Sequence, residues 1–138
     1  MRKILLALVL STVLFACTEE SSDCGDPVSA NCELILLDSL NNYLVGTKYN
    51  PDSIQLHANT FQIPLHFSNG AIIFNFSGLD SLNAFYYILT LNKSDHDTLN
   101  IKISKSVSQC WTSYFIDTIC YNHQILDNNS GNRYEIIK

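Results

Sequence analysis

The tripeptide Asp95-His96-Asp97 places a carboxylate on either side of an imidazole, an arrangement found at no other histidine of the chain. Groups of this kind bind metal ions or transfer protons. Neighbouring residues in a polar turn point in different directions, however, and none of the other three histidines lies at metal-ligand spacing from His96. We therefore expect a solvated turn with no metal or other cofactor. A metal-dependent enzyme centred on this tripeptide is the alternative.

No other pattern of nucleophiles, bases or glycines predicts an enzyme. Serine is plentiful, but no serine lies in the Gly-x-Ser-x-Gly turn of serine hydrolases, and no cysteine and histidine are arranged as a thiol nucleophile and its base. The five glycines form no loop that could cradle a phosphate. We expect a protein that is not an enzyme.

The first 17 residues carry the pattern of an export signal. Two basic residues, Arg2 and Lys3, precede the apolar run 4–15, and the small residue Ala16 precedes Cys17. At about 1.5 Å per residue the run would span only about 18 Å, which is shorter than the roughly 30 Å hydrocarbon core of a bilayer. We therefore expect residues 1–16 to be a removable signal peptide rather than a membrane span.

The segment Leu14-Phe15-Ala16-Cys17 resembles the lipobox of bacterial lipoproteins. That resemblance implies that the Cys17 thiol is acylated, with fatty acids such as palmitate, and that a dedicated peptidase cleaves just before it. Each buried methylene contributes about 0.8 kcal/mol, so two or three acyl chains bind a membrane almost permanently. The membrane is thus the first expected partner. An ordinary secretory signal that happens to precede Cys17 is the alternative.

Residues 17–32 are expected to form the lipidated N-terminus and a tether. The stretch 18–23 is polar and acidic and has no apolar residue to bury. Its Glu19-Glu20 pair resembles the surface-export signals of Bacteroidota lipoproteins, and an ordinary solvated linker is the alternative. We expect the protein in the bacterial cell envelope, lipid-anchored at the outer membrane, on either its periplasmic or its surface face.

Four cysteines follow Cys17, an even number in a chain that is expected to reach an oxidising compartment. They predict two disulfides. Short loops close most readily, which favours Cys24 with Cys32 and Cys110 with Cys120. A bond from the Cys24 region to the Cys110 region, which would fix the N-terminal arm to the sheet, is the alternative. No two of these cysteines have the close spacing of a zinc site.

The charge balance excludes one class of partner. Cleavage after residue 16 would remove two of the eight basic residues and leave all thirteen acidic ones. Binding to nucleic acid needs clustered Lys and Arg, and the remaining basic residues are scattered. We therefore expect no nucleic-acid partner.

Residues 33–138 predict a single all-β domain. Runs rich in Ile, Leu, Phe, Tyr and Thr alternate with clusters of Asn, Asp, Ser and Gly. Strands are expected at 33–38, 53–57, 60–67, 71–76, 84–91, 98–104, 112–121, 124–126 and 133–138, with a loop at 105–111. This spacing favours a single antiparallel β-sandwich, immunoglobulin-like or transthyretin-like, and a small β-barrel is the alternative.

Three local features refine the expected strands. The run 34–37 is apolar throughout, as in a strand that is buried on both faces. Pro64 inside a strand indicates a sheet edge or a bulge, and Ser68-Asn69-Gly70 predicts a hairpin turn.

Five Asp-Ser/Thr-aliphatic triplets resemble the O-glycosylation sequon of Bacteroidota extracytoplasmic proteins. The resemblance implies that the hydroxyl residue of each triplet carries a glycan, and the candidate acceptors are Ser39, Ser53, Ser81, Thr98 and Thr118. The alternative is that Asp caps a turn through its carboxylate while Ser or Thr begins a strand.

Taken together, the lipobox, the acidic tether, the triplets and the strand-rich body resemble the small lipoproteins of Bacteroidota. We expect a non-catalytic, membrane-anchored module that contacts another envelope protein or a glycan. A structural accessory subunit of an envelope complex is the first alternative, and the metal-dependent enzyme is the second.

Overall fold

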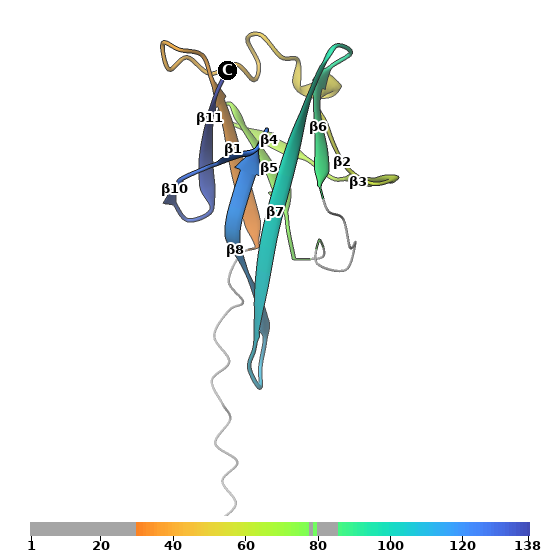
Figure 1. Ribbon diagram of the computed structural model, residues 1–138, viewed down its shortest axis with the longest axis vertical. Coiled ribbons are helices and arrows are strands. Elements are labelled where there is room, and N and C mark those ends of the chain that lie inside the picture. Colours follow the sequence, from red (N-terminus) through yellow and green to blue (C-terminus); the bar gives the residue numbers. More distant parts are fainter. Residues whose placement is uncertain (1–29, 78, 80–85) are drawn as a thin grey trace, which may run out of the picture.

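The computed structural model describes residues 30–77, 79 and 86–138 (Figure 1). Residues 1–16, Cys17, Cys24 and Ser81 lie outside the described residues. The described chain is all-β apart from a short 3-10 turn, η1 (Pro51–Ser53). No helix in the described part of the chain is long and apolar enough to cross a membrane.

The described strands form two sheets that face each other. The five-stranded sheet has the order β10-β11-β1-β5-β4, with β10 (Asn128–Ser130), β11 (Arg133–Ile137), β1 (Asn31–Leu37), β5 (Ala71–Asn75) and β4 (His66–Ser68). The six-stranded sheet has the order β3-β2-β6-β7-β8-β9, with β3 (Phe61–Ile63), β2 (Gln55–Ala58), β6 (Tyr87–Asn92), β7 (Asp95–Val107), β8 (Thr112–Tyr121) and β9 (Gln124–Ile125). The sheets are not closed into a barrel, so the predicted β-sandwich is confirmed and the barrel is excluded.

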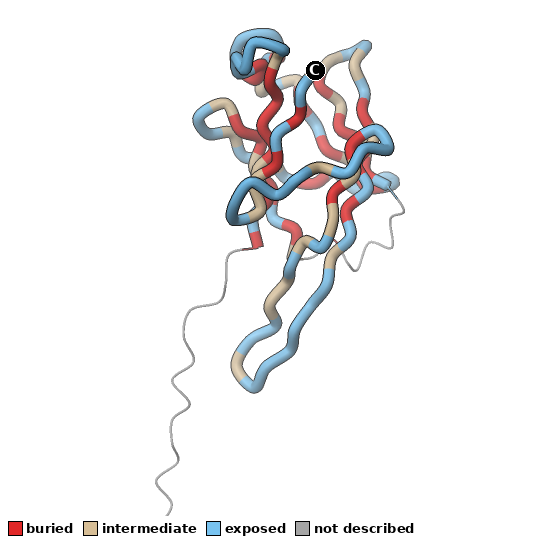
Figure 2. The backbone as a smooth tube through the Cα atoms, turned by 60° about the vertical axis from the view of Figure 1, so that its left-hand side comes forward, coloured by how far each residue is buried: buried red, intermediate tan, exposed pale blue. Residues whose placement is uncertain are grey.

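The core lies between the sheets, and buried residues alternate with more exposed ones along strands such as β6 and β7 (Figure 2). Leu34 and Phe74 contribute from the five-stranded sheet, and Leu89, Leu99 and Ile119 contribute from the six-stranded sheet. All five are at most 2% exposed. Burial of side chains of this size contributes about 1.5–3 kcal/mol each, which makes this layer the main source of stability.

Strand β1 is buried on both faces, as its apolar run predicted. Leu34 and Leu36 point into the core, whereas Ile35 and Leu37 form a second small cluster with Ala71 on the outer face. The pairing of β1 with β11 is parallel, with Glu33 opposite Arg133. The expected antiparallel arrangement is therefore wrong for this pair. A tight turn would impose antiparallel pairing, but about a hundred residues separate the two strands, so none joins them.

Pro64 marks the point where the chain leaves one sheet for the other. The predicted strand 60–67 is divided there into β3 and β4, which are edge strands of different sheets. Proline has no N–H to donate to a neighbouring strand, so pairing ends at this position. The expectation of a sheet edge is confirmed.

Two hairpins close through residues with positive φ. Asn69 (49°) and Gly70 (78°) join β4 to β5, and Asn122 (45°) and His123 (70°) join β8 to β9. Positive φ at both central residues is the conformation of type I′ turns, whose twist matches the twist of paired strands. Gly70 has a second constraint, because an added Cβ would lie 2.8 Å from Cδ1 of Tyr43.

Strands β7 and β8 continue past the sandwich as a two-stranded arm (Figure 1). Pairing extends to Val107 opposite Thr112, and the N–H of Ser108 donates to the carbonyl of Trp111 (2.9 Å) to close the turn. The expected loop at 105–111 is therefore wrong in its first half, because residues 105–107 belong to β7.

Candidate functional site

Strand geometry separates the three residues of Asp95-His96-Asp97. All three belong to β7, so the side chain of His96 points away from the two carboxylates. His96 is exposed, and its Nδ1 lies 3.0 Å from the hydroxyl of Thr90. The expected solvated turn is wrong for these residues, because the turn is shorter and the tripeptide begins a strand.

Both carboxylates contact Lys138, which follows β11 of the opposite sheet. Nζ of Lys138 lies 2.6 Å from Asp95 and 2.7 Å from Asp97. Tyr49 donates its hydroxyl to Asp95 (2.6 Å), and Asn122 donates its side-chain N–H to Asp97 (2.9 Å). The cluster therefore joins the two sheets through a largely buried cation and two carboxylates.

The surroundings shift the pKa of several members of this cluster. Burial acts to raise the pKa of Asp95, but the hydrogen bonds from Lys138 and Tyr49 outweigh it and hold the pKa below its usual value. Burial acts to lower the pKa of Lys138, and its hydrogen bonds to the carboxylates reverse this and raise it. Burial also raises the pKa of Tyr121, with a further contribution from Asp97. This arrangement supports a fixed ion pair between Lys138 and the two carboxylates.

No second histidine converges on the two aspartates in the described part of the chain. No group of three or more His, Cys, Asp or Glu there could hold a metal ion. The amine of Lys138 occupies the position between the carboxylates where a cation would bind.

The two favoured disulfides are wrong. Cys32 and Cys120 both carry free thiols, so neither Cys24–Cys32 nor Cys110–Cys120 forms. Cys32 is fully buried in the core, where burial raises the pKa of its thiol. Cys110 is disulfide-bonded, and its partner lies outside the described residues because the other described cysteines are free. The prediction from loop length failed because Cys32 belongs to β1 and is packed in the core.

The glycosylation candidates that can be placed do not share one surface. Ser39 is exposed in a turn where Asp38 accepts from the N–H groups of Leu40 (2.8 Å) and Asn42 (2.9 Å). The side-chain hydrogen bond from Asn42 also lowers the pKa of Asp38. This is the turn-capping role that the alternative interpretation predicted for Asp.

The other placed acceptors are less accessible. Ser53 donates its hydroxyl within 3.0 Å to the carbonyls of Asn50 and Leu91. Thr98 and Thr118 are half-buried inside β7 and β8. The alternative, in which Asp caps a turn, is wrong for Asp97 and Asp117, because both triplets lie within strands.

A polar row crosses the outer face of the five-stranded sheet. The pairing registers place Arg133, Glu33, Ile73 and His66 side by side on β11, β1, β5 and β4. Next to this row, Asn75 donates to the side-chain oxygen of Asn31 (3.4 Å). The row and the adjacent asparagine pair thus bring a guanidinium, a carboxylate, an imidazole and two amides onto one face.

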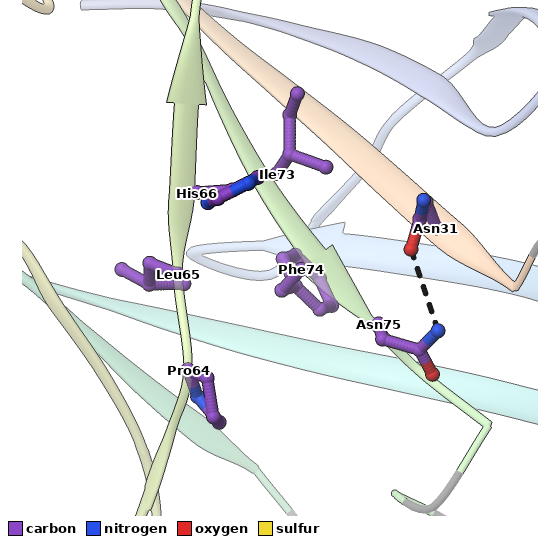
Figure 3. Close-up of a pocket in the computed structure, with 7 residues that line it drawn as sticks. All are labelled: Asn31, Pro64, Leu65, His66, Ile73, Phe74 and Asn75. Atoms are coloured by element: carbon purple, nitrogen blue, oxygen red, sulfur yellow. Dashed lines mark hydrogen bonds between the residues drawn. The ribbon is translucent and has the colours of Figure 1, made fainter.

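Two adjoining pockets flank Ile73 on this face. One encloses about 210 Å³ and lies between Asn31, Asn75, His66 and the segment around Pro64, as Figure 3 shows. The other encloses about 290 Å³, and its lining residues are Glu33, Ile35, Tyr43, Ser68, Asn69, Ala71, Ile73 and Arg133. The outer-face site is defined here as these two pockets.

The sequence prediction missed the outer-face site. Its residues come mainly from β1, β11 and the β4–β5 hairpin, which are far apart in the chain, and only the sheet order places them together. The available signal was the period-two alternation of polar residues in 31–33 and 66–68, which marks one solvent-exposed face on each of these two strands.

No family model matches the chain, and no curated protein or solved structure is significantly similar to it.

Proposed function

We propose that the protein is a lipid-anchored envelope module that binds a glycan, without catalysis, at its outer-face site. The observation that carries the proposal is the pair of adjoining pockets on the five-stranded sheet. The anchor follows from Leu14-Phe15-Ala16-Cys17, whose order resembles a lipobox.

The lining of the pockets suits a polyhydroxylated ligand. Asn31, Asn75 and Asn69 can each donate and accept hydrogen bonds, Glu33 accepts, and Arg133 donates. The ring of Tyr43, which is 46% exposed, offers a flat apolar surface at the edge of the second pocket. Sugars present hydroxyl groups, which match the polar side chains of the pockets, and an apolar ring face, which matches the ring of Tyr43.

The size of the pockets favours an extended ligand. Sites that enclose a small molecule measure roughly 300–1,000 Å³, and each of these pockets is smaller. Two small neighbouring pockets fit consecutive units of a polymer better than one enclosed cofactor. The carboxylates of Asp95 and Asp97, which flank His96 in the sequence, are held by Lys138, so they support a structural role rather than proton transfer.

The test compares substitutions in the outer-face site with the substitution of an exposed histidine on the other sheet. The His66→Ala and Asn75→Ala substitutions alter the outer-face site, whereas His96→Ala alters the other sheet. The probes are soluble peptidoglycan fragments and purified envelope polysaccharides, and binding is measured by calorimetry. In His66→Ala and Asn75→Ala, the loss of one hydrogen bond to the glycan should weaken binding about 5- to 10-fold. The affinity of His96→Ala should be unchanged.

Two results would overturn the proposal. The first is the absence of binding to every glycan of the panel by the wild-type protein. The second is binding that His66→Ala and His96→Ala weaken equally, because the glycan would then lie elsewhere.

A further inference from the structure

The tip of the β7–β8 arm is uncharged and partly apolar. Residues 106–116 contain no Lys, Arg, Asp, Glu or His, in a chain whose net charge is −5. Val107 is 71% exposed and Trp111 is 40% exposed at the tip. A charge-free tip that carries an exposed tryptophan has the composition of a protein surface at a membrane interface.

The arm projects at the end of the molecule where the described chain begins. Figures 1 and 2 both show its tip and the start of β1 at the same end, with Lys138 at the opposite end. The described chain therefore enters the sandwich at the same end as the arm.

The disulfide of Cys110 shortens the distance between the arm and the proposed lipid anchor. Its partner lies outside the described residues. If Cys17 carries the lipid, Cys24 is the remaining cysteine of the chain. Cys24 is seven positions after Cys17, and at about 3.5 Å per position this stretch reaches about 24 Å at most.

We infer that the arm is the membrane-facing end of the protein and that Val107 and Trp111 lie at the headgroups of the bilayer that holds the anchor. This inference rests on the lipid anchor of the proposed function. The indole of Trp111 combines an apolar ring with an N–H donor, which suits the boundary between acyl chains and water. Because the tip is uncharged, contact should not require anionic lipid.

The chain contains its own probe, because Trp111 is its only tryptophan. The lipidated full-length protein is reconstituted into phosphatidylcholine vesicles with or without brominated acyl chains, which quench tryptophan on contact. Quenching should lower the emission of Trp111 about twofold, as expected for a ring at the interface. The Cys110→Ser variant keeps the lipid anchor but lacks the disulfide that holds the arm near it, so quenching of Trp111 should weaken.

A matched control moves the fluorophore to the far end of the molecule. Leu40 is 78% exposed in the turn after β1, so the double variant Trp111→Phe, Leu40→Trp should bind vesicles and show no quenching. Vesicle-bound, lipidated wild-type protein with unquenched Trp111 would overturn the inference and leave the anchor intact. Protein that carries no lipid and does not bind vesicles would instead overturn the anchor, and the inference with it.

Discussion

Lys138 lies between the carboxylates of Asp95 and Asp97 and connects the end of one sheet to the other. The Lys138→Met substitution keeps most of the aliphatic chain and removes the charge, which leaves Asp97, at 5% exposure, without its cation. Breaking a buried ion pair in this way should lower the free energy of unfolding by about 3 kcal/mol. Urea unfolding at pH 7, followed by circular dichroism, measures the change.

Lys48→Met is the control for this substitution. Lys48 is exposed and lies 5.2 Å from the centre of the Tyr49 ring, so its loss should change stability little. Equal stability of the Lys138→Met variant and the wild type would contradict a structural role for the ion pair.

The same cluster predicts how stability depends on pH. The pKa of Asp95 is lowered, so its contribution is present above its unfolded pKa of about 3.9 and is lost as pH falls through the folded pKa. The pKa of Lys138 is raised, so its contribution is present below about 10.4 and is lost as pH rises through the folded pKa. The stability difference between the wild type and Lys138→Met should therefore be largest between these limits.

Unfolding curves measured from acid to alkaline pH give this difference directly. Tyr49, Tyr121 and Lys48 face the cluster in both proteins, so their effects largely cancel. A difference that stays constant from pH 2 to pH 12 would show that the contribution of Lys138 is not electrostatic.

The sequence singled out only the two carboxylates of this cluster. Asp95 and Asp97 stood out because they flank a histidine, but nothing in the sequence indicated their actual partner, Lys138. In a strand, residues two apart share a face, and the cation that completes the cluster is 41 positions beyond Asp97. Such a partner becomes visible only once the packing of the two sheets against each other is known.

At the scale of elements, local patterns predicted strands well where one face is wet. The bounds predicted for 112–121 match β8, and the strand predicted at 98–104 lies within β7, with Leu99 and Ile101 in the core. The extent of β7 was missed because Ser, Lys and Gln at 104–109 resemble a loop in composition. The pairing of two strands at the tip needs no core, so hydrophobic periodicity gives no signal there.

The outer-face site shows why elements had to be assembled before a site could be proposed. Its row runs across β11, β1, β5 and β4, and one of the three pairings in that row is parallel. A shift of one residue in any register would turn these side chains toward the core. No single segment of the sequence carries that information.

For the whole molecule, the proposals define an orientation. The arm would face the membrane, and the outer-face site lies on a side of the sandwich, so a glycan could reach it without crossing the lipid surface. The deficit of basic residues agrees with this arrangement, since it limits electrostatic attraction of the rest of the surface to anionic headgroups. Both proposals depend on acylation at Cys17.

The mass of the N-terminal peptide from membrane-extracted protein shows whether Cys17 is acylated. We expect a chain that begins at Cys17 and carries the added mass of two or three acyl chains, and we expect Cys17→Ala to abolish this form. An unmodified Cys17 in the exported protein, or a mature chain that begins elsewhere, would contradict this expectation.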